Sequence, residues 1–187
     1  MSRSFTTQAI VLKRQASGET DRLTTLLTEE RGKLTVLAKG VRRLNSSHRA
    51  NLEPGNLIQA FIIETKGLPL LTQSQLLLDA SQSYQHQGQQ ALKKISHLEQ
   101  VLEIFDRLFV ENYIDDGCFA LALNIERLSL QNNNQAKKIK QLLNQLLQLL
   151  GYQDIKDTRY ANIADYVAEI TEHKMKSFDY LRHSSSG

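Results

Sequence analysis

The feature that most constrains the fold is a single change in the period of the hydrophobic pattern. Up to about residue 80, short runs rich in β-branched residues alternate apolar and polar side chains, as β-strands with one buried face do. From about residue 88, apolar residues recur at alternating steps of four and three, which is the spacing of one face of an α-helix. The sequence therefore predicts two domains of different secondary structure, over residues 1–80 and 81–187.

The first half contains five strand-like runs. They are "TTQAIVLKR", "RLTTLLTEE", "KLTVLAK", "NLIQAFIIET" and "LLTQSQLLL". Two groups of side chains are expected to share a face: Leu34, Val36 and Ala38 in the third run, and Leu57, Phe61 and Ile63 in the fourth, where Phe61 is expected in the core. Five short strands with a long loop after the third favour a small antiparallel β-barrel, and an OB-fold is the leading candidate.

The second half contains four amphipathic segments, whose apolar stripes predict the core of a helical domain. Asp115 and Asp116 are predicted N-caps of the second helix, and Gly151 is a predicted C-cap of the third. The fourth segment is expected to carry one apolar stripe from Ile163 to Phe178. The predicted fold class is α+β, with an N-terminal five-stranded antiparallel barrel followed by an all-α domain.

Composition argues against several classes of protein. Cys118 is the only cysteine, and the five histidines lie far apart without metal-ligand spacing, so no metal site is predicted. No apolar run approaches the roughly 18 residues needed to cross a membrane. The N-terminus lacks the long apolar region of a signal peptide, so we expect a cytoplasmic protein.

Catalytic motifs are missing as well. The sequence contains no Gly-rich phosphate-binding loop, no GxSxG and no HExxH. The acid pairs at residues 29–30 and 115–116 are interpreted as turn and cap residues, because neighbouring positions do not converge on one metal ion. We therefore predict no enzyme activity, no catalytic residue and no cofactor.

Positive charge is concentrated in the first half of the chain. Residues 1–80 carry 11 Lys and Arg against 7 Asp and Glu, whereas residues 81–187 carry 12 against 13. Five basic side chains crowd into residues 39–49, followed by the acid Glu53; they are Lys39, Arg42, Arg43, His48 and Arg49. Such asymmetry indicates an interaction surface, and the alternative is a solvated basic surface without a partner.

Nucleic-acid phosphates are the ligand that this basic loop fits best. Lys and Arg meet phosphate oxygens, and each neutralised phosphate releases counterions. Further cations are expected to extend the surface: Lys13, Arg14, Arg22, Arg31 and Lys33. Single-strand binders usually stack bases on aromatic side chains, but this half offers only Phe5 and Phe61. Electrostatics should therefore dominate, which predicts little sequence preference and binding of both single and double strands.

Three stretches resemble the bacterial recombination mediator family RecO. They are "AIVLKRQASGETDRLTTLLTEERGKLTVLAKGVRR" at 9–43, "LEPGNLIQAFI" at 52–62 and "GLPLLTQSQLL" at 67–77. The resemblance implies an OB-fold joined to a helical domain, without enzyme turnover. It also implies binding of single- and double-stranded DNA, annealing of complementary strands and, with the partner RecR, help in loading RecA onto DNA coated by single-stranded-DNA-binding protein.

The resemblance assigns roles to particular residues. The DNA phosphates would be carried by Lys13, Arg14, Arg22, Lys39, Arg42, Arg43 and Arg49. The helical half would bind the acidic, hydrophobic C-terminal tail of the single-stranded-DNA-binding protein, in an apolar groove with cationic neighbours. The available cations there are Lys93, Lys94, Arg107, Arg127, Lys137 and Lys138. A family member of this kind is expected in the cytoplasm, associated with the nucleoid.

The sequence departs from the family pattern at one place. Many RecO proteins insert a four-cysteine zinc-binding module after the helix that ends near "LLGY", although some members lack the zinc ligands. Here "GYQDIKDTRYANIADYV" leads directly into the last helix without a cysteine. We therefore expect a short form of the family without this module.

Two other functions are compatible with the pattern. One is an OB-fold RNA-binding factor in translation or RNA processing, which would read the 2′-hydroxyl and so prefer RNA to DNA. The other is an assembly module whose helical half binds a protein while the basic loop is merely soluble surface. Failure to bind any nucleic acid at low salt would favour the latter.

Overall fold

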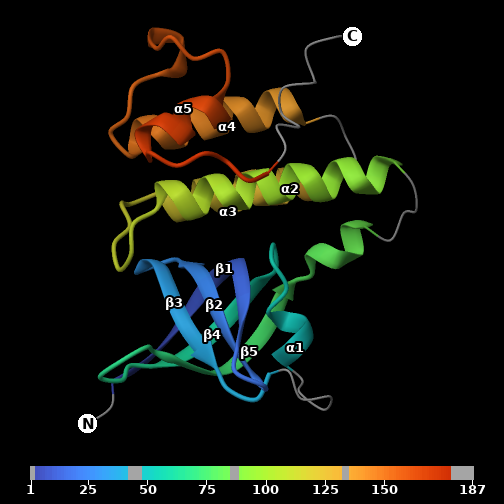
Figure 1. Ribbon diagram of the computed structural model, residues 1–187, viewed down its shortest axis with the longest axis vertical. Helices are drawn as coiled ribbons and strands as arrows, with labels where there is room; N and C mark the ends of the chain where they lie inside the picture. Colours follow the sequence, from blue (N-terminus) through green and yellow to red (C-terminus); the bar gives the residue numbers. More distant parts are fainter. Residues whose placement is uncertain (1–2, 42–47, 85–88, 132–134, 178–187) are drawn as a thin grey trace. The chain divides into compact units, whose positions relative to one another are not determined.

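The chain divides into two compact units in the computed structural model, which describes residues 3–41, 48–84, 89–131 and 135–177 (Figure 1). Contacts between Cα atoms assign residues 1–81 and 110–114 to the first unit, and residues 82–109 and 115–187 to the second. The first unit is a β-barrel and the second is helical. The predicted α+β class is confirmed.

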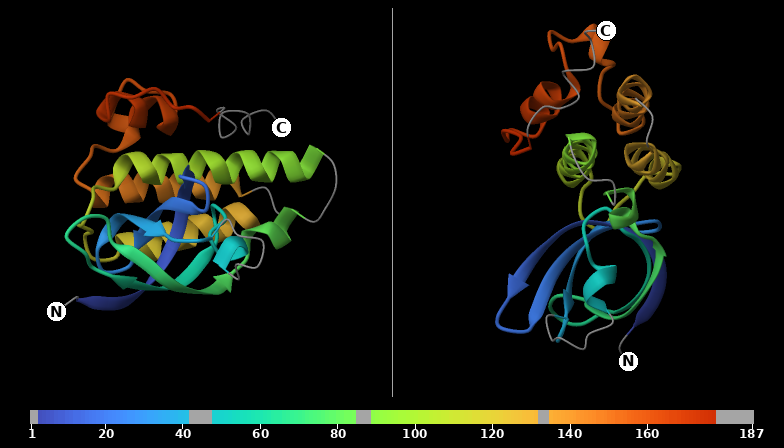
Figure 2. Two further views of the ribbon diagram at one scale, coloured as in Figure 1. Left: turned by 60° about the horizontal axis from the view of Figure 1, so that its bottom comes forward. Right: turned by 90° about the vertical axis from the view of Figure 1, so that its right-hand side faces the viewer.

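The barrel consists of the five predicted strands. They are β1 (Ser4–Ser17), β2 (Asp21–Thr28), β3 (Gly32–Ala38), β4 (Leu57–Ile63) and β5 (Leu70–Leu78), with the short helix α1 (His48–Asn51) between β3 and β4. The strand order is β1-β2-β3-β5-β4, and β4 pairs back with β1, which closes the ring seen in the right-hand view of Figure 2. All pairings are antiparallel except β3 with β5, which is parallel. This closed five-stranded arrangement is the expected OB-type barrel.

One face of every strand fills the barrel interior. The core includes Ala9, Val11, Leu26, Leu34, Val36, Ala38, Val41, Leu52, Ile58, Ala60, Ile62 and Leu71. The predicted inward face of β3 is therefore confirmed. In β4 the inward residues are those at 58, 60 and 62, whereas Phe61 pairs with the exposed Thr6 and is itself partly exposed. The expectation that Phe61 is a core residue was wrong, because the outer face of β4 is also mostly apolar, and Gln59 is the single polar residue that marks it.

A bulge in β1 reverses the direction of its side chains. Val11 pairs with Leu26 and Lys13 pairs with Thr25, so Leu12 is an extra residue. Before the bulge, odd-numbered residues face the interior. After it, the even-numbered Arg14 stands opposite the buried Thr24, and Lys13 is turned to the exposed side.

The segment of residues 110–114 adds a short bridge to the starting end of β3. The backbone N–H of Lys33 donates to the carbonyl of Val110 at 3.2 Å, and the N–H of Asn112 donates to the carbonyl of Lys33 at 2.9 Å. Gly32 lies directly beneath this segment, because a Cβ atom built there would stand 1.9 Å from the carbonyl oxygen of Tyr113. Gly32 also has a φ of +62°, so both space and backbone conformation require glycine.

The helical unit contains the four predicted helices. They are α2 (Gln89–Leu108), α3 (Cys118–Leu130), α4 (Ala136–Leu149) and α5 (Ile163–Ile170), with 3-10 turns η1 (Ala80–Tyr84), which begins in the first unit, and η2 (Ile155–Asp157). Helix α3 packs against both α2 and α4, and α5 contacts α2 and α4. Within the described residues no helix is long and apolar enough to cross a membrane.

The helix ends agree only in part with their predictions. The C-cap of α4 is Leu150, and Gly151 follows it with a φ of +84°. The N–H groups of Gly151 and Tyr152 donate back to Gln148 and Leu147, so the predicted glycine ends the helix, one residue past the cap. At α3 the N-cap is Gly117, and no side chain caps the helix, so the prediction for the two preceding aspartates was wrong. The chain turns there through the N–H of Cys118, which donates to the backbone carbonyl of Asp115.

Helix α5 is shorter than its sequence pattern indicated. The side chain of Asn162 caps its start by accepting from the N–H of Asp165 at 2.8 Å. The helix ends at Ile170, and Glu172 adopts a positive φ of 55°, which is incompatible with a continuing helix. The predicted stripe from Ile163 therefore stops at Ile170, and Phe178 lies outside the described residues.

A carboxyl group is buried in the helical unit. Glu126 of α3 is fully buried, and neither of its side-chain oxygens has a hydrogen-bond partner among the described residues. Burial raises the pKa of Glu126 from its ordinary value of 4.5 to about 8, against the opposing influence of the Arg127 charge. The folded chain therefore holds Glu126 as a neutral acid near pH 7.

We predict that Gly32→Ala destabilises the barrel much more than Gly18→Ala. Gly18 has a similar φ of +61°, but an added Cβ there meets nothing within 4 Å. The control should therefore report the backbone cost alone, about 1 kcal/mol, and Gly32→Ala should cost at least about 2 kcal/mol more. Urea unfolding measures both values. Equal losses would show that the 110–114 segment does not press on Gly32.

We predict that the free energy of unfolding depends on pH through Glu126. Between about pH 4.5 and 8 the folded chain retains a proton that the unfolded chain releases, so stability falls as pH rises across this window and then levels off. Glu126→Gln should remove this slope, gaining on the order of 2 kcal/mol at pH 8 and little at pH 5. Thermal unfolding followed by far-UV circular dichroism tests this, with the exposed Glu99→Gln as control. Parallel pH profiles for wild type and Glu126→Gln would contradict it.

Candidate nucleic-acid interface

Most of the predicted phosphate-binding residues converge on one end of the barrel, next to α1. We call it the α1 end. It combines the C-terminal half of β1, the start of β2 and the end of β3 (Figure 1). In this region Arg14 pairs with Thr24, Ala16 pairs with Arg22, and Arg22 pairs with Ala38, the residue before Lys39. Strand register thus brings together cations that are far apart in sequence.

Two of these cations share one carboxylate. Glu53, which follows α1, forms an ion pair with Arg14, and its Oε1 lies 3.7 Å from Nη1 of Arg22. Arg14 and Arg22 both stand opposite core-facing positions, and the side chain of Arg22 is only 13% exposed. Glu53 therefore compensates the positive charge of two arginines that face the barrel interior. Its ion pairs with Arg14 and Arg22 stabilise this end of the barrel in the absence of any ligand.

Three other predicted residues lie exposed at this end. Lys13 owes its outward position to the β1 bulge, Lys39 directly follows β3, and Arg49 lies in α1. Arg42 and Arg43, between the last two, lie outside the described residues.

Both ends of the basic loop are anchored to the barrel. At its start, the N–H of Gly40 donates to Oδ1 of Asp21 at 2.8 Å. At its end, Nδ2 of Asn51 donates to the carbonyl of Ser74 on β5 at 2.9 Å. The buried Asn56 donates to the carbonyl of Ala50 and accepts from the N–H of Ala80, each at 2.9 Å. Helix α1 is therefore hydrogen-bonded to β5 and to Asn56, the residue before β4, and these bonds fix the helix that carries Arg49.

Two cations that were expected to extend this surface lie at the other end of β2. Arg31 stacks on the ring of Phe5 with 3.7 Å from its Cζ to the ring centroid, and it forms an ion pair with Glu64. Lys33 is engaged through its backbone by residues 110–114. The structure therefore does not bring Arg31 and Lys33 to the α1 end.

Phe61 is the residue that sequence reasoning placed wrongly. It lies on the outer face of β4, between Thr6 of β1 and Gln73 of β5. A signal for this orientation was present, since the polar Gln59 has the same strand parity as Phe61. Alternation from a polar residue predicts an outward ring.

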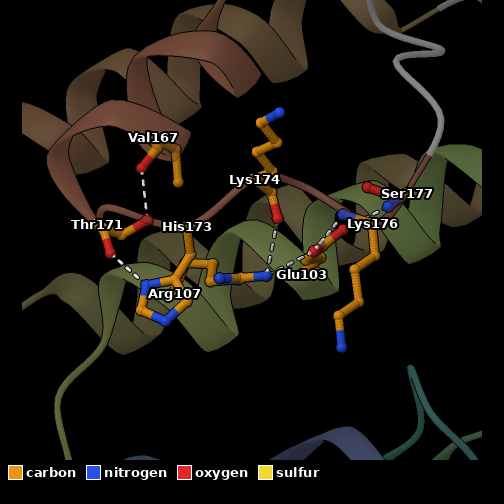
Figure 3. A network of polar contacts seen from close by, with 8 residues as sticks. All are labelled: Glu103, Arg107, Val167, Thr171, His173, Lys174, Lys176 and Ser177. Atoms are coloured by element: carbon orange, nitrogen blue, oxygen red, sulfur yellow. Dashed lines mark hydrogen bonds and ion pairs between the residues drawn. The ribbon is translucent and has the colours of Figure 1, made fainter.

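In the helical unit, one of the cations available for tail binding is already engaged. Arg107 of α2 pairs with Glu103 at 3.1 Å and donates to the carbonyl of Lys174 at 3.1 Å, while Glu103 accepts from the N–H groups of Lys176 and Ser177 at 2.7 Å each (Figure 3). Burial would raise the pKa of Glu103, but the hydrogen bonds from Ser177, Lys176 and Arg107 outweigh it and lower this pKa. Arg107 and Glu103 therefore together fasten residues 174–177 to α2.

The other cations of the helical unit differ in exposure. Lys93, Arg127, Lys137 and Lys138 are exposed, and Lys94 is partly buried. Within the described ranges, no group of three or more His, Cys, Asp or Glu side chains could hold a metal ion. Cys118 is buried, and burial, with the charge of Asp115, raises the pKa of its thiol.

Comparison with known proteins places the barrel in a defined family. Residues 1–78 match the family model described as Recombination protein O N terminal. The chain is 38% identical over 106 residues to the DNA repair protein RecO of Heliobacterium modesticaldum, covering 57% of this chain and 37% of that protein. It is 33% identical over 146 residues to the DNA repair protein RecO of Salinibacter ruber, covering 78% of this chain and 55% of that protein.

The two relatives and the family model match different lengths of this chain. The shared region spans between about a third and just over half of the length of these two relatives. The Salinibacter match is long enough to include helical sequence beyond the barrel. The family model coincides with the five strands and ends at Leu78, the last residue of β5. The chain therefore belongs to the RecO family, and its barrel is the N-terminal domain of that family.

Proposed function

We propose that this protein is a DNA-binding recombination mediator that binds DNA phosphates at the α1 end of its barrel and anneals complementary strands. The observation that carries the proposal is the gathering of cations at this end of a RecO-type domain. Lys13, Lys39 and Arg49 are exposed there, and Arg42 and Arg43 lie between the last two in sequence. In this proposal the protein binds and brings strands together, without catalysing a change in covalent bonds.

Annealing is explained by the electrostatics of such a surface. Two complementary strands repel each other as polyanions, and this repulsion is strongest at low salt. A cationic surface replaces condensed counterions on one strand and lowers the cost of bringing the second strand close. Base pairing then supplies the driving force. The proposed activity thus requires positive charge and access, but no reactive group.

The proposed partners are those of the family. We infer that the protein acts with RecR to help RecA load onto DNA coated by single-stranded-DNA-binding protein, and that the helical unit binds the acidic tail of the coating protein. The exposed Lys93, Arg127, Lys137 and Lys138 support this assignment by charge. Arg107 supports it least, because Glu103 and residue 174 already occupy its guanidinium group.

We predict that the protein accelerates annealing of complementary oligonucleotides coated with single-stranded-DNA-binding protein, and that the effect fades with salt. Replacing Arg42, Arg43 and Arg49 with Ala should weaken binding to bare single-stranded DNA by about ten- to a hundredfold. It should also flatten the slope of log affinity against log salt by up to about 2. Fluorescence anisotropy across a salt series measures both quantities.

The control for this triple variant removes the same charge elsewhere. Lys156, Lys174 and Lys176 are exposed cations of the helical unit, and their replacement with Ala should leave the slope nearly unchanged. Binding without annealing would reduce the protein to a binding module that needs a partner. An equal loss in both triple variants would remove the α1 end from the proposal.

We predict that Glu53→Gln strengthens DNA binding. Removing this carboxylate releases the half-buried Arg14 from its counter-charge, whereas Arg22 is nearly buried, so affinity for single-stranded DNA should rise about three- to tenfold and the salt slope should steepen by up to about 0.7. Glu64→Gln is the matched control, because it removes an acid that pairs with Arg31 at the other end of β2. Equal gains in the two variants would indicate an effect of net charge alone.

A further inference from the structure

The outer face of β1, β4 and β5 carries a surface without charge. Two cross-strand rows define it, and we call it the glutamine face: Thr6, Phe61 and Gln73 in one row, and Gln8, Gln59 and Gln75 in the other. Thr6, Gln73 and Gln75 are exposed, and the other three are partly exposed. Residues 4–12, β4 and β5 contain no Lys, Arg, Asp or Glu, although the chain has 23 basic and 20 acidic residues.

The chemistry of this face suits nucleobases and not phosphates. Phosphates require cations, and none is supplied by these strand segments. Bases offer a flat π surface, which stacks on an aromatic ring, and polar edges, which accept and donate hydrogen bonds to side-chain amides. Phe61 provides the ring, and Gln59 and Gln73 flank it from the neighbouring positions of the same face.

The strand that carries Phe61 begins next to α1. Nδ2 of Asn56, the residue that precedes β4, donates to the carbonyl of Ala50 in α1 at 2.9 Å. Arg49 lies on the same short helix. Phe61 is four residues along β4 from Leu57, which starts β4 at the α1 end, a separation of about 13 Å. This distance lies within the span of a single strand of about 4–16 nucleotides, the site size of OB-folds.

We propose that the glutamine face binds the bases of single-stranded nucleic acid, with Phe61 stacked on one base, while the α1 end holds the phosphates of the same strand. This inference rests on the proposed function and names where the bases of its ligand lie. It gives the protein a preference for single strands, because bases that are paired and stacked inside a duplex cannot reach Phe61. Electrostatics alone predicts no such preference.

The absence of tryptophan from the chain allows a direct test. In Phe61→Trp the single indole should be quenched when oligo-dT binds, because a base stacks on it. Inorganic polyphosphate and an abasic oligonucleotide carry the backbone charge without bases and should bind without quenching. Leu149→Trp, at an exposed position of α4, is the control and should not respond to oligo-dT.

Affinity measurements provide a second, independent test. Phe61→Leu should lower the affinity for oligo-dT about tenfold and leave duplex affinity unchanged, whereas Phe61→Tyr should retain both. Binding of oligo-dT by anisotropy without quenching of Phe61→Trp would overturn this inference and leave the proposed function standing. Equal losses for single strands and duplex in Phe61→Leu would also overturn it. No binding of DNA by the wild-type chain would overturn the proposed function as well.

Discussion

The bulge in β1 is the feature on which the barrel and its candidate site both depend. β1 hydrogen-bonds to β4 through its first half and to β2 from residue 9 onward, so one strand must bend enough to close the ring. The extra residue, Leu12, supplies this bend and increases local twist. It also exchanges the inward and outward positions in the rest of the strand. As a result Lys13 is directed to solvent and Arg14 toward the interior, where it meets Glu53.

The negative charge of Glu53 stabilises the α1 end but weakens the attraction of this end for phosphates. Arg22 is nearly buried, and a buried guanidinium without a counter-charge would be costly, so Glu53 is needed to hold it. The same carboxylate reduces the positive potential available to a phosphate. Exposed cations such as Lys39 and Arg49 have no such compensation in the ion pairs between described residues, and they therefore dominate the proposed interaction with DNA.

Strand-like and helical periodicity predicted much of the fold. Each of the five strands and each of the helices α2 to α5 corresponds to a run of sequence whose hydrophobic period predicted its type, and Gly151 ends α4 as its position indicated. Errors arose where local pattern is degenerate. The outer face of β4 is also mostly apolar, so Phe61 was misplaced, and the apolar stripe after Ile163 continued past the point where Glu172 turns the backbone. For the candidate site, the sequence identified cations but not their counter-charges, since Arg14 and Glu53 are 39 residues apart.

What the sequence determined by itself is the order and type of the elements, the concentration of basic residues in the first half and the resemblance of three stretches to the RecO family. These properties are local or depend on residues near one another along the chain. Only the tertiary structure decided which arginines are paired, that residues 110–114 press on Gly32, and that Phe61 and four strand-borne glutamines share an outer face. These outcomes depend on barrel closure and strand register, which join residues that no local pattern relates.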